Sequence, residues 1–402
     1  MPKRVGKNGE LFKKLVSHDN LERAIDEVNR THHWISGHHP NKCTGWVEIT
    51  KEERITELRV IIENGFVPNK PRITERFDAS ARKMRTICEP KQWPDQYVHH
   101  ALIQVLQPVF MRGMDDYCCG SIRGRGTSRA KNAIEKWVST DNRGTKFELT
   151  ADIHHFYDTL TPEVVMRRMK RLIKDDRILD LIYRITKEGI RIGFYTSQWF
   201  ANVVLQPLDM MIRQSGFAKH YVRYMDNLTI FGSNKKNLHK LKDLIANWLK
   251  DNDLELKGNW QIFKLEFKTR RIPLAPPRNG VQRAKHRLPD AVGYRYGRDY
   301  TIPRKFNFFR LKRAVNKYKK KRANRRKISY RMAAGIMSRL GQIKNCNNQS
   351  LYKILLNGRR LQKELKEIIR RYNEEERLTW NMYLEYLMSK KSSQPKETST
   401  AN

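Results

Sequence analysis

Residues 220–232 read HYVRYMDNLTIFG, and this stretch decides the fold. Apolar and polar residues alternate on both sides of Met225–Asn227, a pattern typical of two short strands joined by a tight turn. The hairpin carries one carboxylate, Asp226, at its tip, with Tyr224 and Asn227 beside it. Since Asp is common in turns for purely local reasons, Asp226 alone indicates little about function.

A second acidic residue follows another strand upstream. Residues 146–160 read KFELTADIHHFYDTL, and strand character is concentrated around Phe147–Ile153, so that Asp152 lies at the strand end. Carboxylates at a hairpin tip and a neighbouring strand end can lie side by side on one sheet. There they can hold two Mg²⁺ ions, or Mn²⁺ in their place, about 4 Å apart, which activate a 3′-hydroxyl and stabilise a leaving pyrophosphate. The ordered pair is therefore a much stronger signal than either Asp alone.

Most of the remaining chain predicts helices around this small sheet. Helical patterns cover residues 10–30 (two short helices), 50–65, 94–111, 162–189, 197–216, 238–252 and 306–369. Between them we expect a basic irregular segment from Pro68 to Met84 and a Gly/Arg loop over Cys118–Thr127. Residues 254–267 resemble a strand, and residues 291–303 predict a second hairpin that turns near Gly297 and Arg298. The sequence thus predicts an α+β fold.

The charge balance indicates a polyanionic ligand. The 402 residues include 81 Lys and Arg against 42 Asp and Glu, a formal net charge of +39. A compact body with so much like charge repels itself unless a polyanion neutralises it, and contacts to phosphates release condensed counterions. A merely solubilising surface usually mixes both signs. With the ample aromatic residues, this pattern favours nucleic-acid binding.

Other features restrict the setting of the protein. The five cysteines show no paired spacing, which favours a reducing, cytoplasmic location. No run of about 18 apolar residues occurs, so no membrane span is expected, and the basic N-terminus has no apolar stretch of a secretory signal behind it. His32, His33, His38, His39 and Cys43 raise the question of zinc, but adjacent His pairs on a loop rarely converge on one ion.

Three segments in order resemble the palm motifs of bacterial reverse transcriptases of the retroelement and defence-associated type, including those of diversity-generating retroelements. They are DIHHFYDTL (152–160), IGFYTSQWFANVVLQPLD (192–209) and RYMDN (223–227). Five further segments resemble other parts of these enzymes, namely two fingers motifs, KMRTICEP (83–90) and CGSIRGRGTSRA (119–130), a fourth palm motif (254–263), the primer-grip hairpin (291–297) and the thumb helices (330–356). The resemblance runs from about Leu11 to Leu356, and so many motifs in the right order are highly specific.

The resemblance implies roles for the residues around the metals. Asp152 and Asp226 would be catalytic metal ligands, with the backbone carbonyl of Ile153 as a further one. Tyr157, five residues after Asp152, would block a ribose 2′-hydroxyl and so favour dNTPs; the alternative is a core aromatic. Arg85 would grip the triphosphate with its planar fork, or be one more solvated charge.

Further positions would bind nucleotide, template or primer. Lys257 would protonate the leaving pyrophosphate, and Lys264 competes for this role. Gln198 would face the incoming nucleotide. The predicted template and primer contacts are Gly193, Ser197, Arg123, Arg125, Tyr224, Tyr294, Lys312 and Arg313. The last two belong to a basic stretch, Lys305–Lys327, that combines charge for phosphates with aromatic faces for sugars or bases.

One residue departs from the family pattern. These enzymes usually have two adjacent Asp at the hairpin tip, and here the second is Asn227, which removes one negative charge beside the metals. We still assign Asn227 to the catalytic group, because an amide oxygen can coordinate a metal or bond to water. The resemblance implies that Asp226 is the bridging ligand, so an active enzyme is still expected. A non-catalytic RNA-binding scaffold is the alternative, and an RNA-templated RNA polymerase is disfavoured by Tyr157.

The resemblance predicts a right-hand polymerase with helical fingers, a small antiparallel palm sheet and a helical thumb. We expect an N-terminal extension and fingers over residues 1–145, a palm over 146–300, a thumb over 301–385 and a disordered tail over 386–402. The expected function is RNA-directed DNA synthesis, copying a dedicated structured non-coding RNA in antiphage defence, with a diversity-generating retroelement as the alternative. Expected ligands are that RNA, nascent DNA and dNTPs; a protein partner or second copy stays open, and no membrane is expected.

Overall fold

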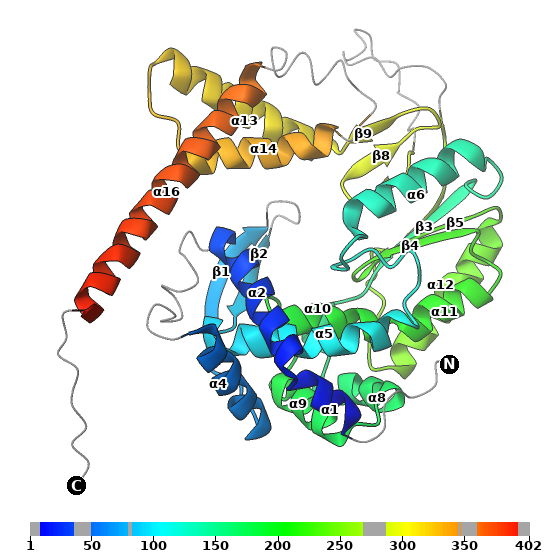
Figure 1. The fold of residues 1–402 in the computed structure, drawn as a ribbon. Helices are drawn as coiled ribbons and strands as arrows, with labels where there is room; N and C mark the ends of the chain where they lie inside the picture. The colour runs from blue at the N-terminus through cyan, green and yellow to red at the C-terminus, as the bar shows by residue number, and fades with distance from the viewer. Residues whose placement is uncertain are drawn as a thin grey trace. The chain divides into compact units, whose positions relative to one another are not determined.

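The computed structural model describes residues 9–35, 50–78, 83–267, 287–344, 346 and 360–392. By its internal contacts the chain divides into two units, one of Met1–Thr31 and Lys51–Thr301, the other of His32–Thr50 and Ile302–Asn402. The predicted α+β class is confirmed, because helices surround small antiparallel sheets in the first unit and the described part of the second is mainly helical (Figure 1). No helix among the described residues is long and apolar enough to cross a membrane.

A four-stranded antiparallel sheet organises the first unit, in the order β4-β5-β3-β6. Its strands are β3 (Phe147–Asp152), β4 (His220–Tyr224), β5 (Asn227–Gly232) and β6 (Gln261–Lys264). Three adjacent strands, β4, β5 and β3, each contribute a fully buried side chain, namely Tyr221, Ile230 and Leu149. Helix α12 (Lys235–Asp251) contacts β3, β5 and β6, and helix α6 (Gly126–Thr140) contacts β4. The predicted hairpin over residues 220–232 is therefore present as β4 and β5.

Helices of the first unit pack around this sheet and around each other. They are α1 (Glu10–Leu15), α2 (His18–Ile35), α4 (Lys51–Glu63), α5 (Tyr97–Met111), α7 (Phe156–Thr159), α8 (Pro162–Leu172), α9 (Asp176–Thr186), α10 (Tyr195–Val204) and α11 (Gln206–Gln214). Caps begin several of them at the expected residue types: the Thr161 side chain accepts from Val164 N at α8, and Asn234 caps α12. Helices α5 and α10 contact each other, which joins the N-terminal helices to the sheet region.

The segment expected to be irregular is a β-hairpin. Strand β1 (Arg72–Asp78) pairs with β2 (Lys83–Glu89), with Arg76 opposite Arg85 and Phe77 opposite Met84. The expectation was wrong because the many charged residues hid an alternation that the register reveals: Ile73, Phe77 and Met84 share one face, although Glu75 lies on that face too and Ile87 on the other. The Gly/Arg loop was also predicted too long, since α6 begins at Gly126.

A smaller antiparallel sheet has the strand order β7-β8-β9. Its strands are β7 (Asp290–Ala291), β8 (Tyr294–Tyr296) and β9 (Thr301–Pro303). The predicted turn near Gly297 is confirmed, since Gly297 N donates to Tyr300 O at 2.7 Å. A Cβ at Gly297 would lie 2.3 Å from the Tyr300 ring, which explains glycine at this position.

The described part of the second unit holds three helices, α13 (Lys305–Ala323), α14 (Tyr330–Lys344) and α16 (Arg360–Ser392). Their common core includes Leu311, Ile336 and Leu365. The tail predicted from residue 386 is corrected in part, because α16 continues to Ser392; residues 360–392 contain neither Gly nor Pro to end a helix. Residues 393–402 lie outside the described part, and the predicted division into fingers, palm and thumb stays a prediction.

Candidate active site

The two predicted metal-binding carboxylates come from adjacent strand ends. In the β4–β5 hairpin Tyr224 pairs with Asn227, so Met225 and Asp226 form the tip, and Met225 adopts a positive φ of 56°. Strand β5 also pairs with β3, which sets Asp152 opposite Asn227. The register therefore places Asp152 beside the hairpin tip that carries Asp226, on one end of the sheet.

The electrostatics of this pair show close approach of two like charges. Burial of the Asp226 carboxyl, and then the negative charge of Asp152, raise the pKa of Asp226 to about 6, while Arg85 acts to lower it. The Asp152 Oδ2 accepts a hydrogen bond from Lys257 Nζ at 3.1 Å. The other oxygen, Oδ1, is buried and accepts no hydrogen bond from the described residues. Asn227 is exposed and its Nδ2 donates to Asp226 Oδ1 at 3.3 Å.

These residues fit a divalent cation. Among the described residues no group of three or more His, Cys, Asp and Glu could hold a metal. Mg²⁺, however, is commonly bound by one or two carboxylates together with substrate phosphates. The buried, unpartnered Oδ1 of Asp152 and the repulsion between Asp152 and Asp226 are both features that a cation would relieve. Asp152 and Asp226 are thus the residues that would hold a divalent cation.

The backbone beside Asp152 is fixed by the segment that carries Lys257. Lys257 N donates to Asp152 O at 2.9 Å, and His154 N donates to Glu255 O at 2.8 Å. Ile153 lies between them, opposite Leu256 in an isolated antiparallel bridge whose two hydrogen bonds come from its neighbours. Lys264 instead pairs with Phe147, at the other end of β3. Of the two candidate lysines, Lys257 is the one beside the carboxylates.

Tyr157 and Arg85 approach the same carboxylates from two other elements. Tyr157 lies on α7, and burial and then the charge of Asp226 raise its pKa, while Arg85 acts to lower it. Arg85 comes from β2 and is partly buried. Residues from β2, α7 and the hairpin tip are therefore close enough to shift one another's pKa, as the predicted nucleotide site requires.

The three predicted residues around the start of α10 differ in their surroundings. Gly193 has a φ of +117°, and a Cβ there would lie 2.3 Å from the Cys88 carbonyl oxygen, so its identity follows from close backbone contact with β2. Cys88 N donates to Ile192 O at 2.8 Å, which anchors that contact. Ser197 is buried within α10, and Gln198 next to it is partly exposed.

The remaining predicted contacts are dispersed. Arg123 is exposed, whereas the Arg125 guanidinium bonds the Asp115 carbonyl oxygen and so holds its own loop. Tyr224 is partly buried beside the tip, and Tyr294 is buried in β8. Lys312 and Arg313 are exposed on α13 in the second unit. In the histidine cluster, His38, His39 and Cys43 lie outside the described residues, as do the side chains of His32 and His33.

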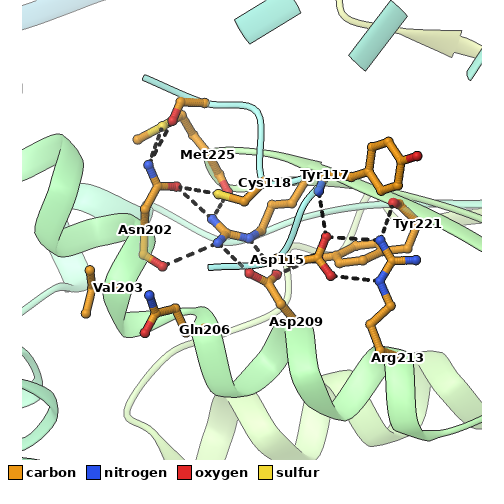
Figure 2. Close-up of polar contacts among 12 residues, drawn as sticks. Asp115, Tyr117, Cys118, Asn202, Val203, Gln206, Asp209, Arg213, Tyr221 and Met225 are labelled. Carbon is orange, nitrogen blue, oxygen red and sulfur yellow. Dashed lines mark hydrogen bonds and ion pairs between the residues drawn. The ribbon is translucent and has the colours of Figure 1, made fainter. Parts of the chain in front are cut away.

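Sequence reasoning missed a buried ion pair beneath the hairpin tip. Arg223 on β4 and Asp209 on α11 are both almost fully buried and bond each other, together with Asn202 of α10 (Figure 2). The available signal was an Asp within an otherwise apolar helix and an Arg within a buried strand.

A small antiparallel sheet with paired carboxylates at one end, surrounded by helices, is the fold of a right-hand polymerase.

The comparison with protein families agrees with this class. Residues 69–267 match the family described as reverse transcriptase (RNA-dependent DNA polymerase). The chain therefore carries a reverse transcriptase domain, and the match indicates RNA-directed DNA polymerase activity for that domain. No curated protein matches the chain.

Among solved structures the chain is similar to two yeast telomerases. Apo telomerase from Candida tropicalis, truncated from its C-terminal domain, is 14% identical with a TM-score of 0.36, covering 50% of this chain and 51% of that chain. Telomerase from Candida albicans with a fragment of telomeric RNA is 12% identical with a TM-score of 0.43, covering 77% of this chain and 56% of that chain. The chain thus spans about half the length of these telomerase chains.

Proposed function

We propose that the protein is an RNA-directed DNA polymerase that binds two Mg²⁺ ions, or Mn²⁺ in their place, through Asp152 and Asp226. The observation that carries the proposal is the register of the sheet, which sets Asp152 opposite Asn227 at the hairpin tip. The mutual effect of the two carboxylates, which helps to raise the pKa of Asp226 to about 6, supports a site built for a cation. When bound, the metals would activate the primer 3′-hydroxyl and stabilise the leaving pyrophosphate.

The other residues of the site have separate tasks. Arg85 binds triphosphate oxygens, because its planar guanidinium can donate two parallel hydrogen bonds to two oxygens of one phosphate. Its position fits this role, since its charge acts to lower the pKa of Asp226. Tyr157 forms a wall that excludes a 2′-hydroxyl and so selects dNTPs by exclusion rather than attraction. Lys257 Nζ, 3.1 Å from Asp152 Oδ2, holds the proton for the leaving pyrophosphate. Asn227 is an uncharged member of the same group.

A structured RNA is the proposed template. The net charge of +39 favours a polyanion, and no Asp or Glu occurs between Asp299 and Glu364, a stretch that includes α13 and α14. Exposed Lys312 and Arg313 follow a duplex backbone in this proposal, and Arg123, Gly193, Ser197 and Gln198 face the template and nucleotide. The protein would work in the cytoplasm with nascent DNA and dNTPs as its other ligands.

The proposed biological role is antiphage defence with one dedicated non-coding RNA as template. The alternative is a diversity-generating retroelement, which would copy a template repeat into a variable target gene. Sequencing the cDNA made by the purified complex separates the two. A single product copied from a neighbouring RNA gene supports defence, and a product that matches a repeat in a protein-coding target supports the retroelement.

The direct test is labelled dNTP incorporation by the purified protein with its co-purifying RNA and Mg²⁺ or Mn²⁺. Wild type is run beside Asp226→Ala and beside Asp243→Ala, an exposed Asp on α12 that serves as the matched control. DNA product from wild type and the control, with none from Asp226→Ala, supports the polymerase. Running NTPs in parallel addresses RNA synthesis, which Tyr157 disfavours.

The competing function is an RNA-binding scaffold without catalysis. It is favoured by Asn227, which provides one negative charge less than a second Asp would beside the metals. A protein that retains RNA tightly but makes no DNA with either metal would establish the scaffold. Gain of incorporation in Asn227→Asp would then identify the missing charge as the reason.

A further inference from the structure

An ion pair lies buried directly beneath the hairpin tip. Arg223, with a side chain 0% exposed, donates from Nε and Nη2 to the two carboxylate oxygens of Asp209, each at 2.7 Å. Tyr221 Oη donates to Asp209 Oδ1 at 2.7 Å (Figure 2). Asp209 belongs to α11 and Arg223 to β4, so the pair joins a helix to the strand that leads to Asp226.

The same guanidinium reaches the tip itself. Arg223 Nη1 donates to the Met225 carbonyl oxygen at 3.1 Å and to Asn202 Oδ1 at 2.9 Å. Asn202 is buried in α10, and its Nδ2 donates to the Gly120 carbonyl oxygen at 2.8 Å. Met225 precedes Asp226 and has a positive φ, a conformation that a residue with a side chain keeps only where its surroundings enforce it.

The tip is also confined from the other side by the segment around Gly120. Arg223 N donates to Tyr117 O at 3.0 Å, and Cys119 N donates to Arg223 O at 2.8 Å, so this segment runs along the edge of β4. A Cβ at Gly120 would lie 2.4 Å from Met225 Sδ and 2.6 Å from Met225 N. Only glycine lets the two backbones come this close.

We propose that Arg223, Asp209 and Asn202, here called the Arg223 network, are positioning residues that hold the hairpin tip so that the Asp226 carboxylate meets Asp152 at the metals. The proposal rests on the proposed function. A buried ion pair is weak evidence for stability, because apolar residues of similar size often replace it without loss. What such residues cannot replace is the donor to the Met225 carbonyl oxygen.

The main experiment separates the effect of the ion pair on stability from its effect on the hairpin tip. The double variant Arg223→Met/Asp209→Leu removes both charges together, and its matched control is Arg213→Met/Asp115→Leu. Arg213 and Asp115 form a neighbouring pair, at 2.8 Å, that bonds strand and loop residues but makes no contact with Met225 among the hydrogen bonds of the described residues. Thermal unfolding, Mn²⁺ binding by electron paramagnetic resonance, kcat, and the KM for dNTPs and for template and primer are measured for both.

We expect the Arg223 double variant to fold, to bind Mn²⁺ at least about tenfold more weakly and to lose about 10- to 100-fold in kcat, since misplacement by about 1 Å has effects of this size. Its KM for template and primer should stay near that of wild type. The control keeps the donor to the Met225 carbonyl oxygen, so its Mn²⁺ affinity and kcat should fall much less than those of the Arg223 double variant. Wild-type Mn²⁺ affinity and kcat in the folded double variant would overturn the proposal. Mn²⁺ binding by the protein that depends on Arg223, without any DNA synthesis by wild type, would reject the proposed function while retaining the positioning role.

Gly120→Ala provides a second test if the double variant does not fold. The added methyl group pushes on Met225 N and Sδ and leaves the ion pair in place. We expect the same weakening of Mn²⁺ binding, and Gly120→Ala with unchanged Mn²⁺ affinity would contradict the proposal.

Discussion

The first unit contains two β-hairpins that each deliver a charged side chain to the proposed site, and they are built in opposite ways. In the β1–β2 hairpin, Ile73 and Phe77 are each 62% exposed and Met84 is 53% exposed, all on the face opposite Arg85. In the β4–β5 hairpin, Arg223 and Ile230 are fully buried. The Asp226 side chain is short, so the position of its carboxylate depends on a fixed backbone. The Arg85 side chain is long and can place its guanidinium by adjusting its own torsion angles.

The largest effect is expected from breaking the buried hairpin with Arg223→Met alone. This leaves the Asp209 carboxylate buried without its partner, which typically costs about 3–5 kcal/mol of unfolding free energy. Chemical denaturation measures the loss, and adding Asp209→Leu should restore most of it. A loss below about 1 kcal/mol would show that Asp209 finds other partners and that the hairpin is not held by this pair.

Glu148 on β3 gives the same buried region a pH dependence. Burial, and then the charge of Asp290, raise the pKa of Glu148 to about 8, and neither carboxylate oxygen has a hydrogen-bond partner in the described residues. Because the pKa of Glu148 is higher in the folded than in the unfolded state, its contribution to the unfolding free energy is fully present below about pH 4.5. That contribution is lost as the pH rises through about 8.

Glu148→Gln should remove this pH dependence of the unfolding free energy. We expect the variant to match wild type near pH 5 and to be more stable by roughly 2–5 kcal/mol at pH 9, measured by denaturant unfolding at both values. Parallel stability curves for the two proteins would contradict a raised pKa at Glu148.

The exposed hairpin should show its importance in substrate binding instead of stability. Arg85→Ala is expected to raise the KM for dNTPs by about 10- to 100-fold through loss of charge-assisted hydrogen bonds, with unfolding free energy changed by less than about 0.5 kcal/mol. Arg76→Ala is the matched control, since Arg76 lies opposite Arg85 in the hairpin and pairs with Glu89. Equal KM changes in both variants would indicate a general effect of charge.

The smallest effect is expected from Phe77→Ala. Phe77 is mostly exposed, so its removal should change the unfolding free energy by no more than about 0.5 kcal/mol. Phe231 of β5 is fully buried, and Phe231→Ala should cost about 3–5 kcal/mol. Similar costs for the two variants would show that the outer face of the β1–β2 hairpin is covered in solution.

The same contrast explains what could be predicted from the sequence. The β4–β5 hairpin was predictable because apolar and polar residues alternate in its sequence on both sides of the turn that carries Asp226. The β1–β2 hairpin was missed because most of its apolar residues stay exposed among many charged ones, so they do not mark a buried face. Arg85 was nevertheless singled out from its motif.

Other residues were hidden for a different reason. In a chain with a net charge of +39, Arg223 has the appearance of one more surface cation, and only the fold brings it to Asp209. Burial of Glu148 likewise depends on which elements cover β3. Long-range pairing of charges is set by tertiary packing, and no local pattern records it.

The contact between Gly193 and Cys88 couples two elements of the proposed site mechanically. It anchors the β1–β2 hairpin to the start of α10 at its base, through Ile192 O and Cys88 N. Arg85 lies three residues before Cys88 on β2, and Gln198 lies on α10, which begins two residues after Gly193. A side chain at Gly193 would press on the Cys88 carbonyl oxygen and would therefore displace the strand of Arg85 and the helix of Gln198 against each other.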